Sequence, residues 1–205
     1  MQRLKDDTRE RILAAGRAEL MRRGFAAASM RAIAAAAGVS AGNLYRYFAG
    51  KEALFEAVVR PAYTRLLSLV RADARLDRRA VKDFRSVQPV ADLLLEACSA
   101  WRVEMLILTD RSAGTRYENV TGVLVRHIER RLSAGLRAGG SAGAARESSF
   151  ILHVMAATFV EGFLMILRED PDERFMDRAV RRLLALFFKD IVTRMRAVLP
   201  QRRGK

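Results

Sequence analysis

Residues 29–51 read SMRAIAAAAGVSAGNLYRYFAGK. Ser29 is expected to cap a helix, because its hydroxyl can accept a hydrogen bond from the free amides of a first turn. The alanine-rich run after it has a high helix propensity. Gly38 ends this helix, since glycine adopts the left-handed conformation without a Cβ clash, and Ser40 caps a second helix two residues later. This spacing predicts a helix-turn-helix.

The second helix of this stretch has an inner and an outer side. Leu44 and Phe48 are four residues apart, so they share a face and are predicted to point inward. The polar and aromatic side chains are left on the other faces: Asn43, Tyr45, Arg46 and Tyr47. Amide, phenol and guanidinium groups on a short helix suit a DNA groove and its phosphates. The stretch therefore predicts a DNA-binding element.

The composition fits such a partner without locating it. The chain has 205 residues, a net charge of +14 and 51% hydrophobic residues. This is enough for a real core, and the charge favours a polyanionic partner. The excess of Lys and Arg is spread along the chain, so part of it is solvated helix surface. The one cysteine, Cys98, excludes an intrachain disulfide and is interpreted as a small buried hydrophobe.

Targeting signals are not expected. The first residues, MQRLKDD, are charged and lack the apolar region of a signal peptide, so we expect no export. The longest apolar run, residues 150–167, is interrupted by His153, Glu161 and Gly162. It is interpreted as a buried helix and not as a membrane span.

The rest of the chain predicts further helices and no sheet. No stretch alternates with period two over a useful length, so we expect an all-α fold with a helix-turn-helix head, a linking helix and a C-terminal helical domain. Pro61 removes a backbone bond in the fourth helix, which should kink or break there before ending near residue 76. We therefore place domains at 1–60 and 61–205. The remaining expected helices span residues 7–23, from 89 to about 108, 115–137, 146–168 and 174–198, with a flexible linker at 139–143.

The residues of the head resemble the TetR family of bacterial transcriptional regulators. The similarity covers roughly residues 8–60, and its most specific part is Gly38-Val-Ser-x-Gly-x-Leu-Tyr-x-Tyr-Phe48 followed by Lys51. One departure is Asn43, where this pattern most often has Thr. Both side chains can bond to bases or phosphate, but Asn can also pair two-pronged with adenine.

The resemblance implies a homodimer whose recognition helices enter successive major grooves of a near-palindromic DNA operator. An unknown small-molecule effector in the C-terminal domain would release the DNA. The positions that match DNA contacts of the family are Arg31, Ser40, Gly42, Asn43, Tyr45, Tyr47 and Lys51. The outer face of the second helix adds Arg46 to the predicted DNA-binding residues. For Tyr45 and Tyr47, packing on the edge of the core is the alternative.

Ligand-contacting residues are predicted from general pocket chemistry alone, since pockets are apolar with a few polar groups. Our candidates are Trp101, Met105, His127, Phe159 and Phe163. Ordinary core packing is the commoner role for aromatic and Met positions at helical spacing. We predict no metal site, because the two histidines lack a helical i, i+4 pair and a cysteine partner. No cofactor is predicted.

Two other classes of function compete with a repressor. A helical enzyme is disfavoured, because the sequence contains no nucleophile elbow, phosphate loop or metal-ligand spacing. The other alternative is a helical ligand-binding or interaction module without operator-specific DNA binding; Asn43, Tyr47 and Lys51 argue against it. We therefore expect a cytoplasmic regulator with no membrane association.

Overall fold

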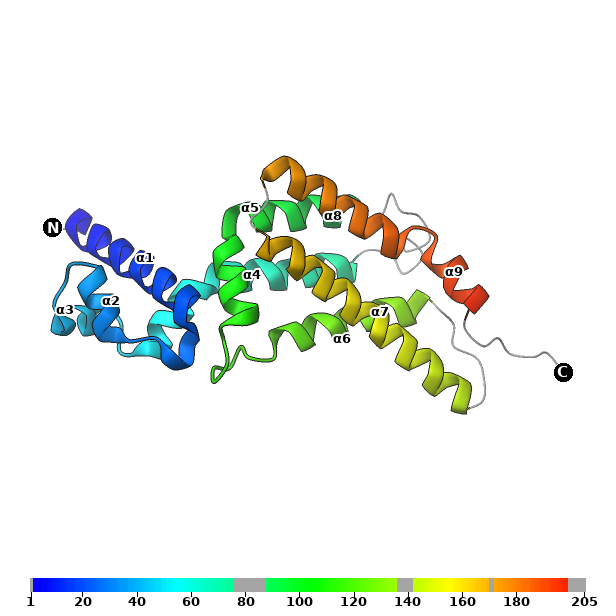
Figure 1. Ribbon diagram of the computed structural model, residues 1–205, viewed down its shortest axis with the longest axis horizontal. Helices are drawn as coiled ribbons and strands as arrows, with labels where there is room; N and C mark the ends of the chain where they lie inside the picture. The colour runs from blue at the N-terminus through cyan, green and yellow to red at the C-terminus, as the bar shows by residue number, and fades with distance from the viewer. Residues whose placement is uncertain (1, 76–87, 136–141, 170–171, 199–205) are drawn as a thin grey trace. The chain divides into compact units, whose positions relative to one another are not determined.

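The computed structural model of the protein describes residues 2–75, 88–135, 142–169 and 172–198 (Figure 1). In these ranges the regular structure is helical and no strand is present, which confirms the predicted all-α class. The helices are α1 Gln2–Ala27, α2 Met30–Ala36, α3 Ala41–Tyr47, α4 Lys51–Arg75, α5 Gln88–Asp110, α6 Val120–Gly135, α7 Ala142–Arg168, α8 Glu173–Phe188 and α9 Ile191–Val198.

The chain forms two compact units. The first contains Met1–Leu66 and Ala100–Val120, and the second contains Leu67–Ser99 and Thr121–Lys205. The helix α4 continues through Pro61 as one element and ends at Arg75, close to the end predicted near residue 76, so the helix does not break at the proline. The first unit therefore consists of more than residues 1–60, because a segment from later in the chain completes it.

The helix α5 changes direction at its middle. Trp101 has φ −137° and ψ 32°, which is outside the helical region. The residues after this break join the first unit: Ile107, Leu108, Tyr117 and Val120 are buried in one apolar core with the first four helices. That core is built around large side chains that are almost fully buried, among them Ile12, Leu20, Ile33, Leu44 and Phe55.

Other helix boundaries differ from the predicted ones. The helix expected at 115–137 begins at Val120, because turns occupy residues 111–119. The helix expected at 174–198 is two helices, α8 and α9, separated at Asp190, whose φ is +53°. Most of the two expected connections, at 71–87 and 139–143, lies outside the described residues.

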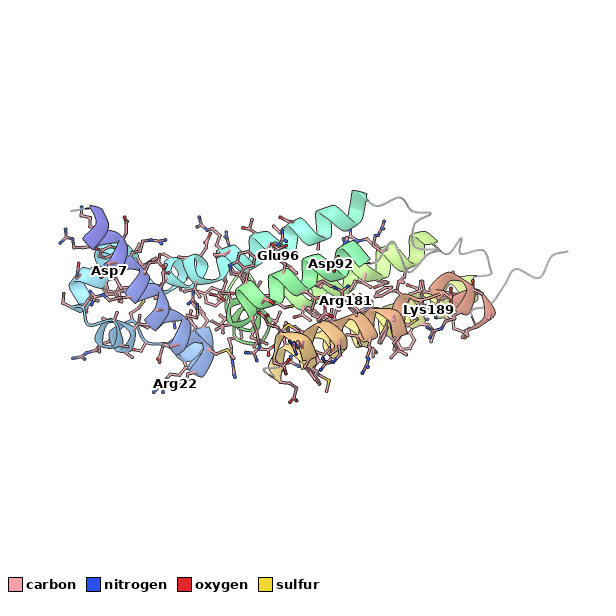
Figure 2. The ribbon with its side chains drawn as sticks, turned by 90° about the horizontal axis from the view of Figure 1, so that it is seen from above. Asp7, Arg22, Asp92, Glu96, Arg181 and Lys189 are labelled. Atoms are coloured by element: carbon pink, nitrogen blue, oxygen red, sulfur yellow. The ribbon has the colours of Figure 1, made fainter. Side chains whose placement is uncertain are left out.

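The second unit contains a tightly packed helix pair and a cross-helix ion pair. Phe159 of α7 makes edge-to-face contacts with Phe187 and Phe188 of α8, at centroid distances of 5.6 and 4.9 Å. Arg181 of α8 donates to Asp92 of α5 across 2.7 Å, and Figure 2 shows these two side chains meeting. Cys98 is fully buried, as predicted.

The helix α7 is apolar on more than one side. Residues Ala145–Arg168 are long and apolar enough, by length and composition, to cross a membrane, and 33% of that window is buried within the structure. One helix of this kind is weak evidence for a membrane span, since core helices of soluble proteins have the same composition. The prediction of a buried helix holds for one face of α7, which includes Leu152 and Leu164. Phe150 and Met165 of the same helix are exposed.

Candidate nucleic-acid interface

The helix α2 begins and ends as its sequence predicts. Ser29 is its N-cap, and the Ser29 hydroxyl accepts a hydrogen bond from the Ala32 amide at 3.4 Å. Beyond the helix end, Gly38 adopts φ +64°, which L residues with a side chain rarely tolerate. The Gly38 amide donates to the Ala35 carbonyl. This turn therefore pairs one of the carbonyl groups that the end of α2 leaves without a partner inside the helix.

The helix α3 is capped and anchored in the same way. The Ser40 hydroxyl accepts a hydrogen bond from the Asn43 amide at 3.2 Å. Leu44 is fully buried, and Phe48, the C-cap residue, is 5% exposed. These two side chains fix one face of α3 to the core, and the opposite face is left to solvent.

The solvent face carries most of the predicted DNA-contacting residues. Gly42, Tyr45 and Arg46 are exposed on α3, and an added Cβ at Gly42 would meet no atom within 4 Å. Asn43 beside them is half-buried. Arg31 of α2 and the capping Ser40 are also exposed. These side chains are thus accessible to solvent on the two helices and the turn of the helix-turn-helix.

Two of the predicted contacts have a structural role as well. Tyr47 is half-buried and packs against the core, as the alternative interpretation proposed. The Lys51 ammonium donates to the Ala26 carbonyl at 3.0 Å and lies 4.7 Å from the centre of the Phe25 ring. An ammonium has three donors, so this bond occupies one of them.

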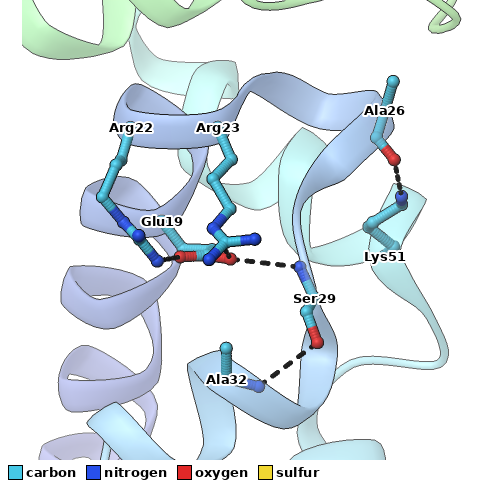
Figure 3. Close-up of polar contacts among 7 residues, drawn as sticks. All are labelled: Glu19, Arg22, Arg23, Ala26, Ser29, Ala32 and Lys51. Atoms are coloured by element: carbon cyan, nitrogen blue, oxygen red, sulfur yellow. Dashed lines mark hydrogen bonds and ion pairs between the residues drawn. The ribbon is translucent and has the colours of Figure 1, made fainter.

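A buried carboxylate lies near the start of α2, and no sequence pattern predicted it (Figure 3). Glu19 of α1 is 6% exposed, and its Oε2 accepts from Arg22 at 2.6 Å. Its Oε1 accepts from the Ser29 amide at 3.4 Å and lies 3.5 Å from Nε of Arg23. Glu19 and Ser29 are ten residues apart, so no helical spacing connects them, and only the folded chain reveals the contact.

The electrostatics of Glu19 follow from these partners. Burial raises the pKa of the carboxyl, because it penalises the charged form. The hydrogen bonds from Arg22 and from the Ser29 amide, together with the charges of Arg22 and Arg23, outweigh that effect. The pKa of Glu19 is therefore lowered from its ordinary value, and the group is ionised at neutral pH.

The residues from 100 to 120 are bonded to the head at several points. The Phe25 amide donates to the Arg111 carbonyl at 2.9 Å. Arg17 of α1 and the buried Glu104 of α5 form an ion pair at 2.6 Å. No sequence pattern predicted this attachment, because these contacts join residues that are far apart in the chain.

The predicted ligand residues divide between the two units. Trp101 and Met105 belong to the first, and His127, Phe159 and Phe163 belong to the second. Met105 and Phe159 are buried, whereas Trp101, His127 and Phe163 are half-buried. Phe159 packs on other aromatic rings of its own unit, which is ordinary core packing.

The first unit is thus defined as a helix-turn-helix domain, with α3 as the helix whose outer face is free. Residues 12–58 match the family model for bacterial regulatory proteins of the tetR family. The N-terminal head is thus similar to the DNA-binding region of TetR-family regulators, in agreement with the resemblance seen in the sequence.

Individual relatives agree over the head. The chain is 41% identical over 71 residues to the HTH-type transcriptional regulator UidR of Escherichia coli K12 and to its counterpart in Shigella flexneri. The match covers 35% of this chain and 36% of UidR, so it spans about a third of the length of these relatives. A crystal structure of a transcriptional regulator (TerR/AcrR family) from Aquifex aeolicus has a similar fold. It has 19% identity and a TM-score of 0.58, and the match covers 88% of this chain and 99% of that one.

Proposed function

We propose that this protein is a DNA-binding transcriptional regulator of the TetR type. The observation that carries the proposal is the outer face of α3, where Gly42, Tyr45 and Arg46 are exposed on a helix that Leu44 and Phe48 anchor. A helix of this kind can enter a major groove with its side chains at base edges. Asn43 is the base reader that we favour, because its amide can bond two-pronged with adenine.

The proposed phosphate contacts surround this helix. Arg31, Ser40, Tyr47 and Lys51 offer guanidinium, hydroxyl and ammonium donors, which suit phosphate oxygens. Gly42 allows the backbone to approach the DNA closely, since nothing covers it. Arg46 and Tyr45 complete the proposed contact surface.

A homodimer is the second part of the proposal. Large apolar side chains are exposed on α7 and α8, with Phe150 64%, Met165 57% and Leu186 65% exposed. Exposed apolar side chains of this size are unfavourable in water and are typical of an interface. Two subunits related by twofold symmetry would place two recognition helices in successive major grooves, so the operator should be near-palindromic.

We further propose that the protein acts in the cytoplasm as a repressor, and that a small-molecule effector in the C-terminal domain releases it from DNA. The two-unit organisation supports this division of labour, with the helix-turn-helix in one unit and most of the C-terminal helices in the other. Trp101, Met105, His127, Phe159 and Phe163 remain our proposed ligand contacts. No enzymatic activity is proposed.

The test is binding to labelled duplexes that tile the DNA around the protein's own gene, followed by fluorescence anisotropy at several salt concentrations. One duplex should bind far more tightly than random-sequence DNA, and log Kd should vary linearly with log salt concentration. Arg46→Gln should lower the slope by about 0.9, the value for one lost phosphate contact in B-DNA, if Arg46 contacts phosphate.

Arg174→Gln is the matched control, because it removes the same charge from an exposed position on α8. It should leave the slope unchanged. Binding to every duplex with equal, weak affinity would favour the alternative of an interaction module without an operator.

A further inference from the structure

A buried carboxylate contacts the start of the helix-turn-helix and is not one of the proposed DNA-contacting residues. Glu19 of α1 is 6% exposed, and both of its oxygens have partners. Burying a charge is unfavourable unless it is paired and hydrogen-bonded, so such a group needs a reason to be retained. The partners of the Glu19 carboxylate show which part of the chain it holds in position.

One partner is the backbone of the residue that starts α2. Glu19 Oε1 accepts from the Ser29 amide at 3.4 Å, and the hydroxyl of the same Ser29 caps α2 by accepting from Ala32 (Figure 3). Ser29 is therefore held to α1 through its amide and to α2 through its hydroxyl. The carboxylate sets the point at which the chain enters the helix-turn-helix.

Helices as short as α2 and α3 depend on such attachments. Each has seven residues, and isolated helices shorter than about 12 residues are marginal in water. Their positions are consequently imposed by the long helices around them. A shift at the start of α2 is carried through the tight turn at Gly38 to α3, because that turn is held by backbone hydrogen bonds.

Two arginines and one lysine complete the arrangement. Arg22 and Arg23 are on the same helix as Glu19, one turn further on, and keep its carboxylate charged. From the other side, Lys51 of α4 bonds to the Ala26 carbonyl at 3.0 Å. The end of α1 is thus held at Ala26 by α4, and the start of α2 is held at Ser29 by Glu19 of α1.

We propose that Glu19 is a positioning residue for DNA binding, which sets the placement of α2 and α3 by holding the Ser29 amide without touching DNA. This inference rests on the proposed DNA-binding function. It assigns to Glu19 an effect on DNA affinity that is separate from its effect on overall stability.

Three substitutions of Glu19 separate position from charge. Glu19→Gln keeps an acceptor of the same length but removes the charge, so it should retain affinity within about twofold of the unchanged protein. Glu19→Asp keeps the charge but is one methylene too short to reach Ser29, and Glu19→Ala removes both features. We expect Asp and Ala to lower the affinity about tenfold, the scale of a lost hydrogen bond to a charged group.

The control is the other buried carboxylate of the head. Glu104 is also 6% exposed, and it pairs with Arg17 of α1 at 2.6 Å instead of with the backbone at the start of α2. Glu104→Gln should alter thermal stability and leave DNA affinity unchanged. All variants are compared as full chains, well below their melting temperatures, on the tightest duplex found for the unchanged protein and on random-sequence DNA.

The salt slope gives the readout that a structural defect alone would not produce. Because Glu19 contacts no phosphate, Asp and Ala should weaken binding with an unchanged slope. Hydrogen exchange of the Ser29 amide should be protected in the Gln variant and fast in the Asp variant. If Glu19→Ala does not fold, the comparison of Asp with Gln decides the question.

The inference is overturned if Glu19→Asp binds DNA as tightly as the unchanged protein, or if the salt slope of the Asp and Ala variants falls. It is also overturned if a given loss of melting temperature brings the same loss of DNA affinity in the Glu19 variants and in Glu104→Gln. If the unchanged protein binds no duplex specifically, the proposed function fails, and the inference fails with it. The two failures are distinguishable, because the failure of the proposed function is seen in the unchanged protein, whereas a failure of the inference alone is seen only in the variants.

Discussion

Arg116 donates to the Glu56 carboxylate across 2.7 Å, although 60 residues separate them in the chain. The same guanidinium donates to the hydroxyl of Tyr117, whose ring contacts those of Phe55 and Tyr63. This cluster attaches the turns at residues 111–119 to α4, which directly follows the helix-turn-helix. The head of the protein therefore includes a later piece of chain, Ala100–Val120, which follows α4 and the first half of α5.

The first prediction concerns Tyr117, which is 6% exposed in the core of the head. Tyr117→Ala should lower the free energy of unfolding by about 3 kcal/mol, the usual effect of removing a buried aromatic ring. Urea denaturation followed by circular dichroism measures it. Tyr45→Ala is the matched control: Tyr45 is 53% exposed, so its removal should change stability by no more than about 0.5 kcal/mol. Equal losses for both tyrosines would contradict this packing.

The second prediction separates folding from DNA binding at Gly42. An added methyl group there meets no atom of the protein, so Gly42→Ala should raise helix stability by about 0.5–1 kcal/mol. The same methyl group would collide with DNA that approaches α3, and binding should weaken by about 1 kcal/mol or more, the scale of an overpacked contact. Thermal melts and anisotropy measure the two effects.

Gly38→Ala serves as the control for that experiment. Gly38 has φ +64°, so a side chain there is strained and stability should fall by about 1–2 kcal/mol. A Gly42→Ala variant with unchanged DNA affinity would remove Gly42 from the proposed interface.

The third prediction follows from the lowered pKa of Glu19. An unfolded Glu has a pKa of about 4.3, and the folded value is lower, so the contribution to stability is complete above about pH 4.3. It is lost as the pH falls through the lowered folded pKa, because the carboxyl then takes up a proton. The difference in unfolding free energy between the unchanged protein and Glu19→Gln should therefore be constant near neutral pH and shrink in acid. Urea titrations at a series of pH values measure it; a difference independent of pH would contradict the ionised state.

The fourth prediction tests the proposed dimer. Leu186 is 65% exposed on α8, so Leu186→Glu should leave the fold intact but place a charge in the proposed interface. Light scattering should then report monomers at concentrations at which the unchanged protein is dimeric. Val123→Glu, at an exposed position on α6, is the control and should remain dimeric. A monomeric unchanged protein would refute the interface.

The fifth prediction concerns Cys98. Burial raises the pKa of its thiol to about 12, because the thiolate is poorly solvated inside the protein. Iodoacetamide at pH 8 should leave Cys98 unmodified in the folded protein and alkylate it in urea, as mass spectrometry can measure. Rapid labelling without denaturant would show that the second unit opens at this point.

Local chemistry explains why so much of the head was predictable. Ser29, Gly38 and Ser40 each act on atoms within a few residues, so the boundaries of α2 and α3 follow from their side chains. The period of the apolar residues likewise predicted that Leu44 and Phe48 are buried. The side chains of α3 that do not share the face of Leu44 and Phe48 then formed the candidate DNA-contacting face.

The tertiary structure decided how the remaining pieces combine. The helix α4 continues through Pro61 without a break, and the break of α5 at Trp101 reverses the simple expectation that an apolar run forms one continuous helix. Packing against neighbouring helices stabilises α4 more than the loss of one backbone hydrogen bond at Pro61 destabilises it. Local helix propensity does not include this packing.

The sequence by itself determined the helix-turn-helix, because its signals are local, and it showed the similarity of the head to the TetR family. Only the folded chain placed Glu19 on the Ser29 amide and Arg116 on Glu56, since those contacts join residues that no short-range pattern connects. Such long-range contacts form when several helices bury a common core, and their positions are determined by that packing as a whole.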